Sequence, residues 1–215
     1  MGGNGSRRVC EDKRQRVPLG FGNLYASTGD HIGHFYQSSA EGKDVLISFL
    51  KTGLDAHEKC VCLAGSNPRP QELLEALGAT GMDVERALAS GQLVVEEGKS
   101  DPSELREMLS LALGEIPRRF PLLRWAEITS WAFKKLPTTA KLREWETYCD
   151  TIENPAAVFL CQYELSGCPG TVVMDAMQTH PICIVNSVIH QNPYYEKPQA
   201  CLKTVHSRTT GTVAS

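Results

Sequence analysis

Several features that would assign a chemistry at once are missing from this chain of 215 residues. No apolar run approaches the roughly 20 residues that cross a bilayer, and no apolar signal segment follows the N-terminal charges. Neither charge dominates, because 22 Lys and Arg stand against 25 Asp and Glu, for a formal net charge of −3. A protein that neutralises phosphates needs a clustered basic surface. These absences predict a cytoplasmic protein that does not bind nucleic acid directly.

Catalytic motifs are missing as well. The chain has no Gly-x-Ser-x-Gly nucleophile elbow. In an α/β protein the first strand-to-helix turn is where a phosphate-binding loop is expected, and we assign that turn to Gly65-Ser66-Asn67-Pro68-Arg69-Pro70. It lacks the Gly-Lys-Ser/Thr ending, and its prolines remove two backbone N–H groups. The sequence therefore predicts no functional P-loop, no catalytic residue and no cofactor.

What the chain does contain is an alternation of apolar runs and amphipathic stretches. The runs predict six strands, near residues 31–37, 59–64, 92–96, 122–129, 156–163 and 182–190. Strands separated by helices pair in parallel with right-handed crossovers, so the predicted fold is a three-layer α/β sandwich with a mainly parallel sheet. Residues 29–198 form the domain, residues 1–28 a flexible arm and residues 199–215 a flexible tail. Ligands in such sheets bind at the carboxyl ends of the strands.

Histidine and cysteine are present, but their spacing does not predict a metal site. His31 and His34 are three apart, which puts them on opposite faces of a strand. Cys60 and Cys62 share a face without a second cysteine pair, and Cys161 lies in an apolar run where a thiol behaves as a small hydrophobe. We expect all eight cysteines to be reduced and no metal to be bound, while a metal- or haem-binding redox sensor stays open as an alternative.

Two further segments place polar groups beside apolar ones. The stretch Trp125–Trp131 combines the carboxylate of Glu127 with two indoles, a set that suits a small polar or cationic ligand. His180 precedes a proline and Asn192-Pro193 forces a turn, so we expect them at opposite ends of one strand unless it breaks near Asn186. Of the two, we expect the turn with Tyr194 to approach the ligand.

The N-terminus Met1-Gly2-Gly3-Asn4-Gly5-Ser6 matches the myristoylation pattern and is followed by Arg7 and Arg8. An acyl chain beside basic residues makes a two-signal membrane anchor. The sequence thus predicts no membrane association unless Gly2 is myristoylated.

Five motifs taken together carry a family resemblance. In order and spacing, the chain resembles the MEDS domain, the methanogen/methylotroph, DcmR-type sensory domain, over about residues 29–198. The motifs are His31-Ile-Gly-His-Phe-Tyr36, Trp125-Ala-Glu-Ile-Thr-Ser-Trp-Ala132, Cys161-Gln-Tyr-Glu-Leu165, Thr179-His-Pro181 and Asn192-Pro-Tyr-Tyr195.

The resemblance implies a RecA/KaiC-like core without nucleotide hydrolysis that senses small organic, often one-carbon, compounds. Carried over by motif, the ligand-binding positions are His31, His34, Phe35, Tyr36, Glu127, Trp131, Gln162, Tyr163, Asn192 and Tyr194. Such a domain acts through a separate kinase or transcription regulator, through self-association as a homo-oligomer, or by simple ligand binding. The competing hypothesis is a divergent nucleotide-using or hydrolytic enzyme on the same scaffold, with Glu127 as general base supported by His180 or His31.

Overall fold

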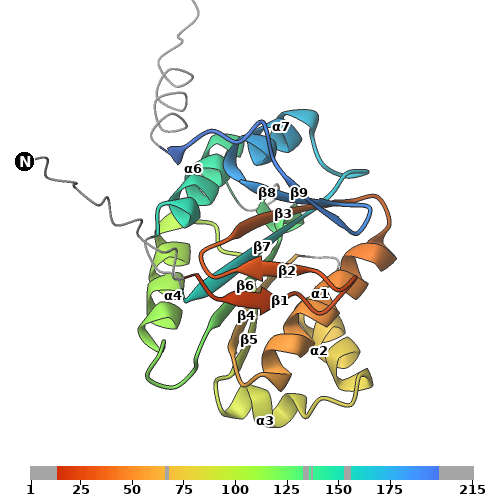
Figure 1. The fold of residues 1–215 in the computed structure, drawn as a ribbon, viewed down its shortest axis with the longest axis vertical. Helices are drawn as coiled ribbons and strands as arrows, with labels where there is room; N and C mark the ends of the chain where they lie inside the picture. Colours follow the sequence, from red (N-terminus) through yellow and green to blue (C-terminus); the bar gives the residue numbers. More distant parts are fainter. Residues whose placement is uncertain (1–13, 66–67, 133–135, 137, 153–155, 199–215) are drawn as a thin grey trace, which may run out of the picture.

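The main sheet runs through the middle of the molecule and is covered by helices on both faces (Figure 1). The computed structural model describes residues 14–65, 68–132, 136, 138–152 and 156–198. The seven strands lie in the order β5-β4-β6-β7-β3-β8-β9. Their bounds are β3 (His31–Tyr36), β4 (Lys59–Ala64), β5 (Leu93–Glu97), β6 (Leu123–Ile128), β7 (Ala157–Glu164), β8 (Ile182–Val185) and β9 (Val188–Gln191). All neighbours pair in parallel except β9, which is antiparallel to β8.

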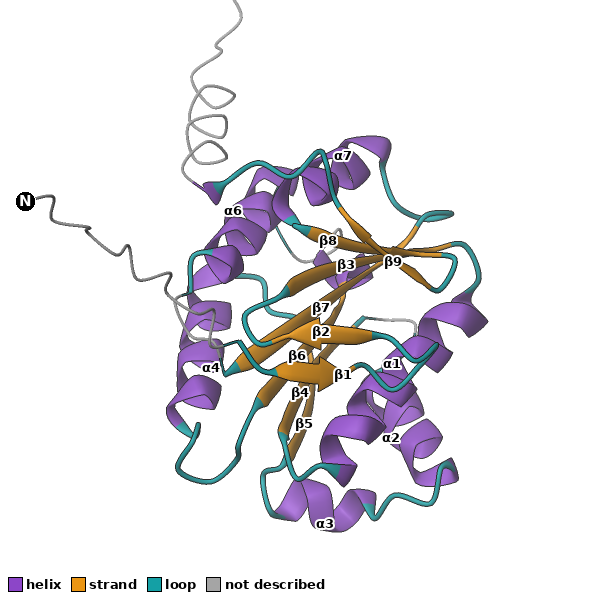
Figure 2. Ribbon diagram, in the orientation of Figure 1, coloured by secondary structure: helices purple, strands orange, loops and turns teal. Residues whose placement is uncertain are grey.

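The central strands are buried on both sides, as continuous apolar runs require. One face packs against α1 (Ser39–Asp55), α2 (Pro70–Ala79) and α3 (Val84–Ala89). The other packs against α4 (Pro102–Gly114), α6 (Thr139–Asp150) and α7 (Gly170–Thr179), and a short 3-10 helix, η1 (Thr129–Trp131), follows β6. Figure 2 shows the resulting three layers, which confirm the predicted α/β sandwich. None of the described helices is long and apolar enough to cross a bilayer.

Local signals account for several element boundaries. The Asp101 carboxylate caps the start of α4, where it accepts a hydrogen bond from the Ser103 backbone N–H at 2.9 Å. Apolar residues four apart, such as Val45, Phe49 and Leu46, Leu50, give α1 its buried side. The helices α6 and α7 were not predicted, although Leu142, Trp145 and Cys149 in α6 have helical spacing and are buried.

The expected N-terminal arm is folded over its described part. Strands β1 (Arg16–Pro18) and β2 (Tyr25–Ser27) form an antiparallel hairpin, and Val17, Leu19 and Ala26 are buried in the core. Buried Arg124 at the start of β6 donates a hydrogen bond to the Pro18 carbonyl at 2.9 Å. The prediction of a flexible arm is therefore wrong for residues 14–28, and residues 1–13 and 199–215 lie outside the described residues.

The predicted strand near 182–190 is a hairpin. It breaks at Asn186 and Ser187, whose φ angles of 50° and 58° form the left-handed turn that joins β8 to β9. The return strand brings Asn192 back to the beginning of β8, where its side-chain amide donates to the His180 carbonyl at 2.7 Å. The expected separation of His180 and Asn192 at opposite strand ends is therefore wrong, because the strand breaks at Asn186, the exception that the prediction allowed.

Candidate functional site

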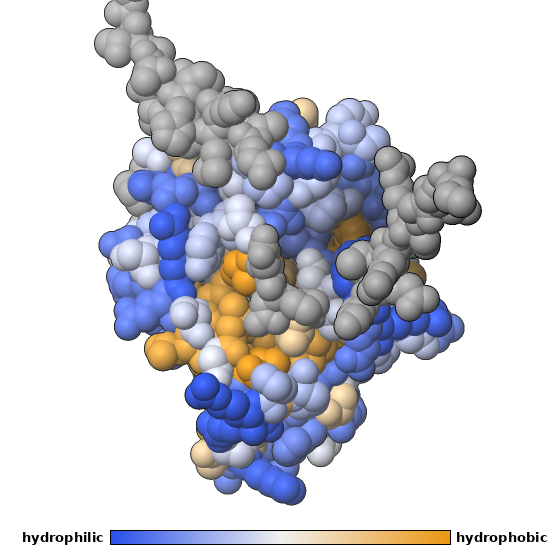
Figure 3. All heavy atoms as spheres, turned by 60° about the vertical axis from the view of Figure 1, so that its left-hand side comes forward, coloured by the Kyte–Doolittle hydropathy of each residue, from blue (hydrophilic) through white to orange (hydrophobic). Residues whose placement is uncertain are grey.

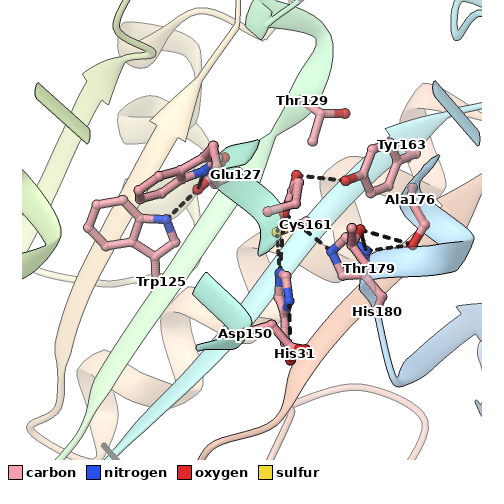
Figure 4. A network of polar contacts seen from close by, with 12 residues as sticks. His31, Trp125, Glu127, Thr129, Asp150, Cys161, Tyr163, Ala176, Thr179 and His180 are labelled. Carbon is pink, nitrogen blue, oxygen red and sulfur yellow. Dashed lines mark hydrogen bonds and ion pairs between the residues drawn. The ribbon is translucent and has the colours of Figure 1, made fainter. Parts of the chain in front are cut away.

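A cluster of four buried polar side chains lies on the sheet face that α4, α6 and α7 cover. We call His31, Glu146, Cys161 and His180 the His–Glu–Cys cluster; one ligand-type atom from each lies within 4.8 Å of the others. His31 opens β3, Cys161 is in β7, Glu146 is in α6 and His180 joins α7 to β8. Figure 4 shows His31, Cys161 and His180 directed toward one another. At most 1% of any of these residues is exposed.

Glu146 is the centre of the cluster. Its Oε2 lies 3.2 Å from His31 Nε2, 3.5 Å from His180 Nε2 and 3.4 Å from Cys161 Sγ. Its Oε1 accepts a hydrogen bond from the Tyr163 hydroxyl at 2.7 Å. Burial works to raise the pKa of Glu146, but hydrogen bonds with His180 and His31 outweigh burial and hold that pKa below its usual range. Glu146 is therefore an ionised carboxylate.

The pKa shifts of His31 and Cys161 both favour the neutral forms of these side chains. Burial, and then the adjacent His180, lowers the pKa of His31. Burial, and then the charge of Glu146, raises the pKa of the Cys161 thiol well above its usual value. Cys161 is free of disulfide bonds, as expected, but its polar contacts with Glu146 and His31 mean that it is more than a small core hydrophobe.

Glu127 sits next to the cluster, in β6. Its Oε1 accepts hydrogen bonds from the indole N–H groups of Trp125 at 2.6 Å and Trp145 at 2.8 Å, while Oε2 has no hydrogen-bond partner within the described part of the chain. Burial, and then repulsion from Glu146, raises the pKa of Glu127 to about 8. The aromatic wall predicted around Glu127 is real, but it is built by Trp125 and Trp145. Trp131 packs instead on Gly98.

A second polar group lies on the opposite face, at the carboxyl end of β3. The ring nitrogen His34 Nδ1 and the side-chain amide Nε2 of Gln162 are 3.0 Å apart, and that amide also donates to the Gly42 carbonyl at 2.9 Å. A Cβ at Gly42 would lie 2.4 Å from Tyr36 Cε2, so the Tyr36 ring lies directly against the first turns of α1. As predicted, His31 and His34 are on opposite faces.

This corner contains the true first strand-to-helix turn of the main sheet. In chain order the first strand is β3, so the turn is Gln37-Ser38 rather than residues 65–70, and the earlier assignment of that position is wrong. The helix already begins at Ser39, and the Gly42 N–H donates to the Ser38 carbonyl at 3.1 Å. Gly42-Lys43 is followed by Asp44 where a P-loop has a hydroxyl. A phosphate cradle is therefore lacking at residues 37–44.

A hollow of about 20 Å³ lies beside this turn. Its polar lining comes from Tyr36, Ser39, Lys43, Gln162 and Glu164. The Ser39 hydroxyl donates to the Glu164 carboxylate at 2.7 Å. A water-sized molecule needs about this much space. The hollow therefore suits only a very small ligand as it stands.

The structure thus divides the ten predicted ligand positions. His31, Glu127 and Tyr163 belong to or adjoin the cluster, and Phe35 stacks on Tyr163 with ring centroids 5.2 Å apart. His34, Tyr36 and Gln162 gather at the turn before α1. Asn192 holds His180 through its carbonyl, Trp131 lies apart, and Tyr194 is 64% exposed.

Two members of the cluster, Glu146 and Cys161, could be recognised only from the folded structure. Glu146 lies in a helix that was not predicted, between Trp145 and Thr147, in no recognisable motif. Cys161 was assigned to the apolar core because its neighbours in sequence are apolar. The one usable signal was His180, since an imidazole next to a buried strand needs a partner.

The strand order and the helices on both faces define an α/β sandwich with a mainly parallel sheet. The solved structure of a KaiC-like protein from the hyperthermophilic archaeon Pyrococcus horikoshii OT3 is similar, with a TM-score of 0.59 and 16% identity over 80% of each chain. A comparison with curated proteins found no match. The family model described as MEthanogen/methylotroph, DcmR Sensory domain (MEDS) matches residues 30–181. The chain belongs to this family of sensory domains.

Proposed function

We propose that the chain is a non-catalytic sensory module that binds a small organic molecule, of one-carbon size, in the hollow beside α1. The observation that carries the proposal is the turn Gln37-Ser38 after β3. This turn lacks a phosphate cradle, although it lies where a nucleotide-using α/β protein holds phosphate. Family membership supports a sensing and regulatory role. A ligand shifts such a module only if it binds one of two conformations better than the other.

The side chains at this turn support the absence of nucleotide chemistry. The chain turns directly into α1 after Ser38, without the glycine-rich loop that surrounds phosphate in a P-loop. The Tyr36 ring packs against Gly42, and the wall holds the Glu164 carboxylate as well as the Lys43 ammonium, so it offers no net positive charge to an anion. Asp44 adds a second negative charge in place of the hydroxyl that binds magnesium.

The same side chains suit a small neutral or cationic molecule. Gln162 and Ser39 offer hydrogen-bonding groups, Glu164 offers a negative charge, and Tyr36 offers an aromatic face. The buried carboxylate Glu127 does not support the enzyme hypothesis, because its Oε1 is held by two indoles and 0% of the residue is exposed.

The signal would pass to a separate kinase or transcription regulator, or between copies of the chain. Figure 3 shows apolar residues gathered on the side of the molecule where α4 lies, and Leu111 of α4 is 68% exposed.

The test uses a matched pair of glycine variants. Methanol, methylamine and formamide serve as probes, and binding is measured as a shift in melting temperature and by ligand-observed NMR. In Gly42→Ala the new methyl group displaces the Tyr36 ring, so we expect binding to be lost. In Gly114→Ala, where a Cβ meets nothing within 4 Å, binding should be unchanged.

Two results would contradict the proposal. The first is binding that survives in Gly42→Ala, which would place the ligand elsewhere. The second is magnesium-dependent ATP hydrolysis by the purified chain, removed by Glu127→Gln, which would establish the enzyme instead.

A further inference from the structure

We propose that the His–Glu–Cys cluster binds one divalent transition-metal ion, with Zn²⁺ the best match. The ligand atoms are His31 Nε2, Glu146 Oε2, Cys161 Sγ and His180 Nε2, all buried. This site lies on the opposite face of the sheet from the hollow beside α1. It stands independently of the sensory role.

The distances between the ligand atoms fit four-coordinate geometry. Four of the six separations are 3.2, 3.4, 3.4 and 3.5 Å, and the others stay within 4.8 Å. Edges of this length surround a point about 2.0–2.1 Å from each corner of a regular tetrahedron, which is the length of Zn–N and Zn–O bonds. Hydrogen bonding alone would not require four side chains from separate elements to converge on one point.

The surrounding groups prepare the ligand atoms. His180 Nδ1 lies 2.8 Å from the Ala176 carbonyl, and because a carbonyl only accepts, Nδ1 carries the proton. In the neutral ring that would bind a metal, the lone pair is then on Nε2, a buried atom 3.5 Å from Glu146 Oε2. The Tyr163 hydroxyl holds Glu146 Oε1, which leaves Oε2 for the cluster. Metal sites typically fix the outer atoms of their ligands in this way.

The charges also favour a dication. Two neutral imidazoles, one carboxylate and one thiolate carry −2, so a divalent ion makes the buried group neutral. On binding, the metal–sulfur bond forms and the thiol proton leaves to solvent. A nitrogen- and sulfur-rich set favours Zn²⁺, Co²⁺ or Fe²⁺ over Mg²⁺ and Ca²⁺, which prefer oxygen.

All four positions are filled by the protein, which is typical of a structural site rather than one that activates water. The ion would join β3, β7, α6 and the junction of α7 with β8, elements that are distant in sequence. Gly33 keeps this junction close, because a Cβ there would lie 3.2 Å from His180 Cγ. Metal binding would therefore fix the β8–β9 hairpin relative to the centre of the sheet.

The test is Co²⁺ titration of the full chain after removal of metal under reducing conditions. We expect about one Co²⁺ per chain, with the intense visible bands of tetrahedral cobalt and a sulfur-to-cobalt charge-transfer band, both displaced by one equivalent of Zn²⁺. Cys161→Ser should lose the charge-transfer band, and Tyr163→Phe should weaken metal binding about 10- to 100-fold. Cys183→Ser is the matched control, because this buried thiol in β8 is outside the cluster.

The outcomes separate this site from the sensory proposal. A wild-type chain that takes up no Co²⁺ or Zn²⁺, or whose charge-transfer band survives in Cys161→Ser and vanishes in Cys183→Ser, refutes the metal site and leaves ligand binding beside α1 untouched. ATP hydrolysis would refute the sensory role and leave the metal site standing. The wild-type cobalt spectrum decides the matter even if a variant fails to fold.

Discussion

Removal of one hydroxyl tests whether Glu146 is held as an ionised buried carboxylate. In Tyr163→Phe the ring keeps its stacking on Phe35 and its edge contact with His180, but Glu146 loses a 2.7 Å hydrogen bond. A hydrogen bond to a charged group contributes about 1.5–3 kcal/mol. At about 2–4 °C per kcal/mol for a chain of this size, the melting temperature should fall by about 3–12 °C.

The assays are thermal unfolding for the melting temperature and urea unfolding for the free energy, both with a chelator present so that bound metal does not contribute. Tyr148→Phe is the control, because Tyr148 is half-buried on α6 and its hydroxyl makes no hydrogen bond within the described part of the structure. We expect this control to change the free energy of unfolding by less than about 0.5 kcal/mol. Equal losses in the two variants would show that the Tyr163–Glu146 bond does not stabilise the fold as reasoned here.

Two further predictions concern the opposite face and the C-terminal hairpin. Burial lowers the pKa of His34 from 6.5 to about 4, so the folded state favours the neutral ring. The contribution of His34 to the free energy of unfolding is therefore complete above pH 6.5, and it falls by about 3 kcal/mol as the pH drops toward 4. Unfolding measured from pH 7 to 4 should show a weaker pH dependence in His34→Asn, and an unchanged slope would contradict this. Ser187→Gly should raise the free energy of unfolding by about 0.5–1 kcal/mol, because Ser187 has a φ of 58° and glycine adopts this left-handed conformation more easily. A loss of stability in urea titrations would show that the turn is not strained.

The sheet could be predicted because its strands carry a strong local signal. Runs such as Cys60–Ala64 and Val158–Cys161 are apolar at every position, and only strands covered on both faces need that pattern. The parallel pairing of the strands could be predicted because helices separate them along the chain. Parallel pairing in turn places the carboxyl ends of the strands at one edge of the sheet. The N-terminal hairpin escaped prediction because three-residue strands such as Arg16–Pro18 carry almost no periodicity, and their burial depends on distant partners such as Arg124.

The His–Glu–Cys cluster could be predicted only in part, because its geometry is non-local. His31 was selected from its motif, but its partners are 115 to 149 positions away in the sequence. Whether Cys161 faces apolar or polar groups depends on which helix covers β7, and that helix, α6, has a low apolar content. The phosphate position was misplaced for a related reason: the turn after His31–Tyr36 contains no proline or glycine that marks a loop, whereas the turn after Ala64 is rich in proline.

The chain beyond β9 makes two hydrogen bonds close to the histidines of the cluster, one to the His180 carbonyl and one to Asp150 beside His31. Asn192 grips the carbonyl of His180, and the Tyr195 hydroxyl donates to Asp150, whose carboxylate faces His31 Nδ1 at 3.9 Å. This short segment, Asn192–Tyr195, therefore ties the α7–β8 junction to the end of α6, and it does so at the surface, where Tyr194 is 64% exposed.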